Sequence, residues 1–125
     1  MRWLWSLLWA SLITYLSLMP ANKLPDNDLF HLLFIDKWIH LFLYFIFSLL
    51  LLAAWKQNQP FILKAATVTL FCIAFGFTIE MLQDKLTTTR HFEWLDLVAD
   101  SVGALVYVGI WLRRRSLDFW KKSAQ

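Results

Sequence analysis

The chain carries a group of side chains that could bind a polar ligand or exchange protons, set within a strongly apolar sequence. The group lies between residues 76 and 103, and long apolar runs flank it on both sides. Its members are five carboxylates (Glu80, Asp84, Glu93, Asp96, Asp100), together with Gln83, Arg90 and His91. Ionisable residues inside a membrane segment are costly and usually functional. We therefore expect a functional polar site here.

Three kinds of chemistry suit these residue types, and the first is recognition. The Arg90 guanidinium, helped by Lys37, would pair with a phosphate or carboxylate headgroup through charge-assisted hydrogen bonds. The carboxylates and the amide of Gln83 would then bond to hydroxyl or amine groups of the same ligand. We rank this binding of a headgroup or an envelope precursor first.

Catalysis is the second kind, as a hydrolase or transferase reaction. The candidate catalytic residues are His40, Glu80 and Asp96, whose side chains suit acid–base work. A His with Glu and Asp could also hold a divalent cation. No HExxH or comparable ligand motif occurs, however, so we predict no metal and no cofactor. Transport of ions or protons ranks third, because the polar path toward the other face is poor.

The composition indicates an integral membrane protein. Of 125 residues, 59% are hydrophobic, and they include 8 Trp and 11 Phe. A soluble domain of this size could not bury so many large apolar side chains. The formal net charge of +3 does not indicate nucleic-acid binding, because the basic residues lie at segment ends and in the tail. The single cysteine, Cys72, lies within an apolar run and is expected to be a buried apolar residue.

The apolar runs predict an all-α polytopic fold with one domain over residues 1–125. The four expected transmembrane spans cover residues 3–19, 38–55, 61–82 and 94–112. The first could be taken for a signal peptide, but no clear cleavage site follows it, so we interpret it as a retained helix ended by Pro20. The short apolar stretch Leu29–Ile35 is too brief to span and is expected at the membrane interface.

Charge placement predicts the orientation. With the amino terminus in the cytoplasm, eight of the twelve basic residues fall inside and eight of the nine acidic residues fall outside. This agrees with the positive-inside rule, and the opposite orientation violates it. Both termini are therefore expected inside. The polar loop over residues 83–93 is expected on the external face.

Depth and helical spacing predict that the polar side chains converge. At about 1.5 Å per residue, His40 and Glu80 lie about 6 Å below the outer boundary, Asp96 about 5 Å and Asp100 about 10 Å. Asp36, His40 and Tyr44 share one helix face, as do Glu80, Gln83 and Asp84. Asp96, Asp100, Gly103 and Tyr107 form a third stripe, on which Gly103 would let another helix approach closely. We expect a small acidic cleft, with Arg90 folded over it onto Glu80 or Asp96.

Two motifs resemble the signatures of VanZ-like membrane proteins. Asp36-Lys37-Trp38-Ile39-His40-Leu41-Phe42-Leu43-Tyr44 is similar to the DKxxHxxxY signature, and the residues from Glu80 to Gly103 are similar to the second, ExxQ…R…D…N..G. Asp100 departs from it, since relatives commonly carry Asn. The resemblance covers roughly residues 1–112. It implies a multi-pass protein of the bacterial plasma (inner) membrane, associated with the cell envelope and with low-level resistance to the glycopeptide teicoplanin. It names no reaction.

Structural roles for the same residues remain open alternatives. His40 could be a buried histidine bonded to a neighbouring helix, and Asp36 with Lys37 could be an interfacial anchor. Glu80 and Asp96 could form ion pairs with Arg90 that join the helices. The expected partners are membrane lipids and a lipid-linked or glycopeptide ligand, without nucleic acid. The candidate ligand-binding residues are Asp36, Lys37, His40, Tyr44, Glu80, Gln83, Arg90, Asp96 and Asp100.

Overall fold

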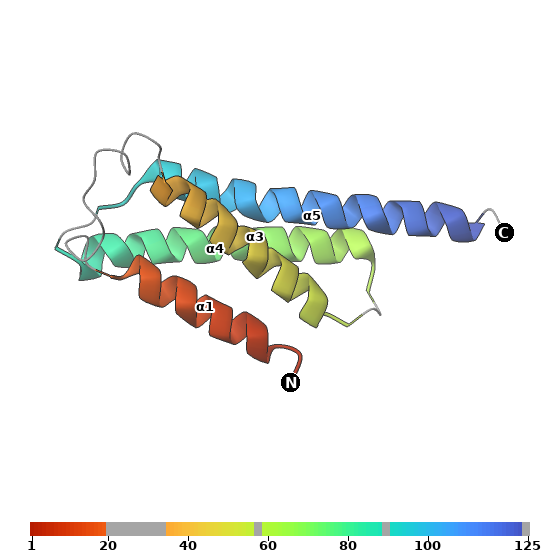
Figure 1. Ribbon diagram of the computed structural model, residues 1–125, viewed down its shortest axis with the longest axis horizontal. Coiled ribbons are helices and arrows are strands. Elements are labelled where there is room, and N and C mark those ends of the chain that lie inside the picture. Colours follow the sequence, from red (N-terminus) through yellow and green to blue (C-terminus); the bar gives the residue numbers. More distant parts are fainter. Residues whose placement is uncertain (20–34, 57–58, 89–90, 124–125) are drawn as a thin grey trace.

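The protein is a bundle of four helices in the computed structural model, which describes residues 1–19, 35–56, 59–88 and 91–123. The helices are α1 (Leu4–Ser17), α3 (Ile35–Ala54), α4 (Phe61–Leu86) and α5 (Trp94–Ser123). Successive helices run in opposite directions, so the start of α1, the α3–α4 turn and the end of α5 lie toward one end (Figure 1). The expected all-α class is confirmed.

The helix ends follow from local sequence. Helix α4 begins directly after Pro60, whose φ of −54° suits a helix start, and it ends where Thr87 becomes extended. The predicted end at residue 82 is four residues early. Helix α5 continues past the predicted end at residue 112, because the following Arg, Leu and Lys residues favour helix and neither Gly nor Pro interrupts them. Helix α3 starts at Ile35, so Asp36 and Lys37 lie in its first turn.

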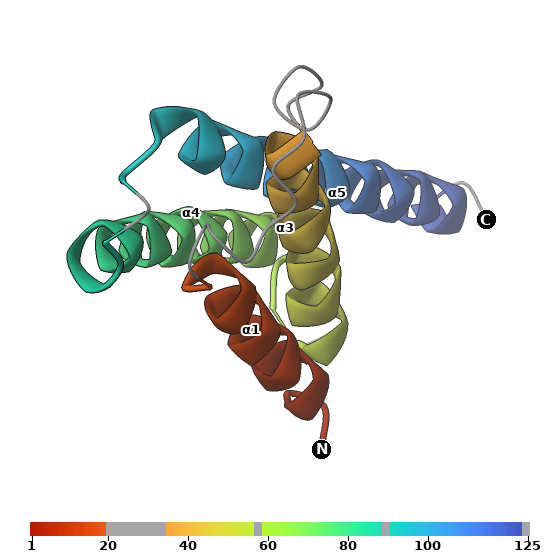
Figure 2. The ribbon, with the colours of Figure 1, turned by 60° about the vertical axis from the view of Figure 1, so that its left-hand side comes forward.

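Helices α3, α4 and α5 form the centre of the bundle. Helix α3 packs most extensively on α5, and α4 packs mainly on α5. Helix α3 crosses α4 and α5 obliquely, and the carboxyl-terminal part of α5 extends beyond the other helices (Figures 1 and 2). Helix α1 lies mainly against α3, where the Trp9 indole N–H donates to the Leu43 carbonyl at 2.9 Å. The residues near the start of α3 and α5 are thereby brought to the same end.

Apolar side chains fill the interior and also cover much of the outside. Ile13, Tyr44, Phe47, Val68 and Cys72 are buried, which confirms the expectation for the cysteine. The large exposed apolar residues are spread over all four helices and include Trp5, Trp38, Phe42, Ile62, Leu70, Phe71, Trp94, Val98 and Leu105. A water-exposed surface of this kind would be unfavourable, whereas a lipid-facing one is normal.

Three helices, α3, α4 and α5, are long and apolar enough to cross a membrane. Helix α1 is apolar but has only 14 residues, about 21 Å at 1.5 Å per residue. The fourth predicted span therefore stays a prediction. The interfacial stretch proposed for residues 29–35 lies outside the described residues, apart from Ile35.

Candidate functional site

A cluster of buried polar side chains lies where the start of α3, the end of α4 and the start of α5 meet. The buried polar residues of this end include His40, Glu80, Gln83, Asp96 and Asp100. Their grouping follows from the alternating helix directions, since the first turns of α3 and α5 face the last turns of α4. The expected convergence of three helix stripes is therefore observed. That these residues bind a ligand stays a prediction.

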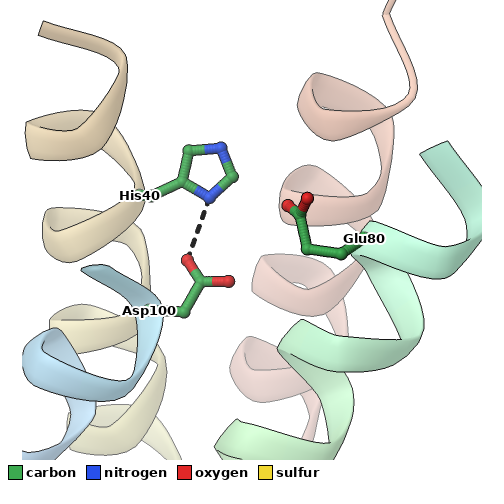
Figure 3. A group of neighbouring side chains, drawn as sticks. All are labelled: His40, Glu80 and Asp100. Atoms are coloured by element: carbon green, nitrogen blue, oxygen red, sulfur yellow. Dashed lines mark hydrogen bonds and ion pairs between the residues drawn. The ribbon is translucent and has the colours of Figure 1, made fainter. Parts of the chain in front are cut away.

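The deepest part consists of His40, Glu80 and Asp100, which we call the inner cluster. His40 Nδ1 lies 2.9 Å from Asp100 Oδ1, a hydrogen-bonding distance at which the imidazole N–H donates to the carboxylate. Glu80 reaches toward this pair from α4 (Figure 3). One donor atom from each residue lies within 4.8 Å of those of the other two. Three helices thus supply one side chain each to a single small volume.

Only one oxygen of Glu80 has a hydrogen-bond partner among the described residues. Its Oε2 accepts the backbone N–H of Glu93 at 3.2 Å, just before the start of α5, where the helix dipole favours a negative charge. Its Oε1 is buried and has no such partner. Glu80 is 0% exposed, so this oxygen does not reach bulk water. One oxygen of the carboxylate is therefore held by the backbone before α5, and the other is buried without a partner among the described residues.

Tyr44 and Gly76 complete the surroundings of the inner cluster. The Tyr44 hydroxyl is buried without a hydrogen-bond partner in the described part of the chain. Gly76, one turn before Glu80 on α4, leaves space there: a Cβ on it would lie 2.8 Å from Asp100 Oδ2 and 3.4 Å from the Tyr44 hydroxyl. The hydroxyl and the Asp100 carboxylate therefore face the same point. Sequence reasoning placed Tyr44 correctly on the His40 face.

Lys37 forms the outer part of the site together with three carboxylates, and we call this group the Lys37 cluster. Its Nζ lies 2.8 Å from Asp36 Oδ2, 2.5 Å from Glu93 Oε2 and 2.5 Å from Asp96 Oδ1. The Lys37 side chain is 15% exposed and that of Glu93 is 56% exposed, so the Lys37 cluster is the rim. Exposure thus falls from the rim to the inner cluster.

The partners of His40 and Asp96 can be identified among the described residues. The closest partner of His40 is Asp100, whereas its Nε2 lies 4.0 Å from Asp96 Oδ2, within reach of one bridging water. Depth counting treats the helices as parallel, but α3 crosses α5 obliquely (Figure 1), and His40 lies within hydrogen-bonding distance of Asp100. The cation on Asp96 is Lys37. Arg90, expected in that role, lies outside the described residues.

Gln83, predicted to bind ligand, has a structural contact through its amide nitrogen. Its Nε2 donates to the Ser17 carbonyl at 2.6 Å, at the end of α1 where the helix leaves carbonyl groups without intrahelical partners. Gln83 therefore joins α4 to α1, and its predicted part in ligand binding stays a prediction.

Glu93 and Gly76 lie at the site but are not among the candidate binding residues predicted from the sequence. Glu93 bonds to Lys37 through its carboxylate and to Glu80 through its backbone N–H. Its position three residues before Asp96, one helical turn away, was an available signal. Gly76 lies four residues before Glu80, on the same helix face, which is the spacing that places it beside the polar group.

The arrangement could serve two purposes. The carboxylates can accept hydrogen bonds from hydroxyl or ammonium groups, and the His40–Asp100 pair has the geometry of an oriented base. No family model matches the chain, and no curated protein or solved structure matches it. The function is therefore inferred from the geometry of the site, together with the resemblance of its residues to the VanZ-like signatures.

Proposed function

We propose that the chain crosses the bacterial plasma membrane four times, with both termini in the cytoplasm and the polar site at the outer face. The distribution of charge supports this orientation. Among the described residues, the site end carries the acids Asp36, Glu80, Asp84, Glu93, Asp96 and Asp100. The opposite end carries the bases Arg2, Lys56, Lys64, Arg113, Arg114, Arg115 and Lys121.

The site, in our proposal, binds the polar headgroup of a lipid or of a lipid-linked peptidoglycan precursor. The observation that carries this is Glu80 Oε1, a buried carboxylate oxygen that has no hydrogen-bond partner among the described residues. Its side chain reaches toward His40 and Asp100 (Figure 3). Such an oxygen is costly unless a donor reaches it. In the described site, five carboxylates have only one lysine and one histidine as basic partners. The matching headgroup therefore presents amine and hydroxyl donors, while Arg90 keeps its predicted role as the phosphate partner.

The resemblance to VanZ-like proteins supports the same assignment. Both signatures fall on the polar site. The first contains Asp36, Lys37, His40 and Tyr44, and the second contains Glu80, Gln83 and Asp96, with Asp100 where relatives commonly carry Asn. We extend the proposal accordingly to a role in the cell envelope and in resistance to glycopeptides such as teicoplanin.

Acid–base hydrolysis or transfer at the headgroup is a second candidate, favoured by the His40–Asp100 hydrogen bond. His40 would act as the general base, and Asp100 would position its ring. Under this alternative, Glu80→Gln would abolish turnover of a lipid-linked substrate while binding is kept.

The binding proposal is tested with purified protein in nanodiscs. The probe is a polyprenyl-linked amino sugar, and the same polyprenyl phosphate without the sugar serves as reference. We expect Glu80→Gln to weaken binding of the amino sugar moderately and Arg90→Ala to weaken binding of both probes strongly. Asp84→Asn, an exposed carboxylate change one turn away on α4, is the matched control. Equal affinity of the Glu80→Gln, Arg90→Ala and Asp84→Asn proteins would contradict the proposal.

A further inference from the structure

The sequence lacks a metal-ligand motif and predicts no metal, but the inner cluster combines an imidazole with two carboxylates whose donor atoms lie as close together as one metal ion needs. We propose that His40, Glu80 and Asp100 bind a divalent first-row metal ion, with Zn²⁺ and Mn²⁺ as the best matches. One nitrogen and two oxygen donors suit these ions, because imidazole favours zinc and carboxylates favour manganese. The ion would occupy the same Glu80 oxygen that the headgroup proposal assigns to a donor, so the two ligands would compete there, and metal binding is therefore measured without lipid.

The distances fit a metal site after small movements. Two donor atoms bound to one tetrahedral ion at about 2.1 Å lie about 3.4 Å apart. In the inner cluster the His40–Asp100 pair is at 2.9 Å and all three donor atoms lie within 4.8 Å. To bind an ion, the His40 and Asp100 donor atoms would move slightly apart, and the Glu80 carboxylate would move closer to them. Rotation of the side chains is sufficient for both changes. Figure 3 shows the three side chains directed toward a common point.

The charge of the inner cluster also matches a divalent cation. Glu80 and Asp100 are 0% and 1% exposed, and the helices that carry them are long and apolar enough to cross a membrane. Two buried carboxylates with a neutral imidazole carry a charge of −2, which a divalent ion neutralises. The alternative is that protons neutralise the two carboxylates. A metal-bound cluster and a protonated cluster can be distinguished by measuring metal binding.

Unpartnered polar atoms supply an independent indication of a ligand. Glu80 Oε1 and the Tyr44 hydroxyl are both buried without a hydrogen-bond partner among the described residues. Tyr44 is 1% exposed and its hydroxyl faces Gly76, beside the Asp100 carboxylate. Buried polar atoms are normally satisfied, so both would gain from an ion and its bound water. Glu80 Oε1 would bind the ion directly, and Tyr44 would bond to the water.

The Lys37 cluster does not compete for the ion but supports the inner site. Asp36, Glu93 and Asp96 are also grouped closely, but the Lys37 ammonium forms ion pairs with all three and takes the place of a metal cation. Asp96 lies 4.0 Å from His40 Nε2. Histidines that bind metal commonly direct the other ring nitrogen to a carboxylate. Asp96, fixed by Lys37, is therefore suited to orient the His40 ring while Nδ1 faces the ion.

The test is metal binding to the purified full chain in detergent, after removal of bound metal with a chelator. Titration calorimetry with Zn²⁺ and with Mn²⁺ should show one site per chain, and Mg²⁺ should bind far more weakly. Glu80→Gln and Asp100→Asn should each weaken binding by about 100-fold or more. Asp84→Asn should leave it unchanged. The ion should also raise the melting temperature of the unaltered protein but not that of the Glu80→Gln protein.

A spectroscopic measurement keeps the proposal testable if a variant folds poorly. In a Cys72→Ala background, His40→Cys replaces the nitrogen ligand with a thiolate. Added Co²⁺ should then give a thiolate-to-cobalt charge-transfer band that the Cys72→Ala protein lacks. Three outcomes would overturn the proposal: no stoichiometric binding to the unaltered protein, binding lost in Asp36→Asn but kept in Glu80→Gln, or no such band in a folded His40→Cys protein.

Discussion

Gly103 of α5 lies directly against the backbone carbonyl of Leu41 in α3. A Cβ on Gly103 would overlap this carbonyl oxygen and would lie 2.9 Å from the carbonyl carbon. Leu41 follows His40, and Gly103 lies one turn after Asp100. The contact therefore fixes how closely α3 and α5 approach at the level where His40 bonds to Asp100, and it confirms the close approach expected at this glycine.

Gly103→Ala should destabilise the protein by about 1–3 kcal/mol, because the added methyl group meets backbone that cannot rotate away. Gly109→Ala on the same helix is the matched control, since a Cβ there meets nothing within 4 Å. Thermal unfolding in detergent measures both. Equal melting temperatures for the two variants would mean that α3 and α5 are not in backbone contact.

Lys37→Met should destabilise the protein by on the order of 3 kcal/mol, because it leaves Asp96 without its cation while Asp96 is only 9% exposed at the side chain. Adding Asp96→Asn should restore much of the loss, since the uncompensated charge is then removed. Lys85→Met, at an exposed position of the same end, should have little effect. If the double variant is no more stable than Lys37→Met, the Lys37–Asp96 pair is not energetically coupled.

Tyr44→Phe separates stability from binding. In the protein without ligand the change should be neutral or stabilising, because it removes a buried hydroxyl that lacks a hydrogen-bond partner in the described part of the chain. In the presence of Zn²⁺ or Mn²⁺ it should weaken binding by roughly tenfold, since it removes a group that supports the ion's water. Calorimetry and thermal unfolding on the same samples give both quantities. A large loss of stability without metal would show that the hydroxyl already has a partner.

The orientation can be checked with single cysteines in a Cys72→Ala background. A membrane-impermeant maleimide applied to intact cells should label Thr88→Cys, next to the end of α4 at the site. It should label Gln59→Cys, beside the start of α4 at the opposite end, only after the membrane is opened. Labelling of Gln59→Cys in intact cells would reverse the orientation and place the polar site in the cytoplasm.

The positions of the helices, and the residues that meet at the site, could be predicted from the sequence. The apolar runs locate all four helices, and the four-residue spacing of His40 and Tyr44 places both on the buried face of α3. The ends were less predictable, because α5 continues through Arg113 and beyond, where hydropathy falls but helix propensity does not.

The pairing within the site could not be predicted from the sequence. Counting residues gives depth along each helix axis, but the partner of a side chain depends on how the axes cross. The oblique course of α3 pairs His40 with Asp100 instead of Asp96. The role of Lys37 also depends on tertiary structure, because its partner Glu93 lies 56 positions away in the sequence.

The shortness of α1 has a consequence for the bilayer around the protein. If α1 crosses the membrane as proposed, its length of about 21 Å falls short of a hydrocarbon core of about 30 Å. Trp3 packs on Trp55 at the end opposite the polar site, so in the proposed orientation the shortfall lies at the outer end, where Ser17 meets Gln83. Such a hydrophobic mismatch is relieved by local thinning of the bilayer. Headgroups of the outer leaflet would then dip beside α1 toward the depth of Glu80, giving a lipid-linked molecule lateral access.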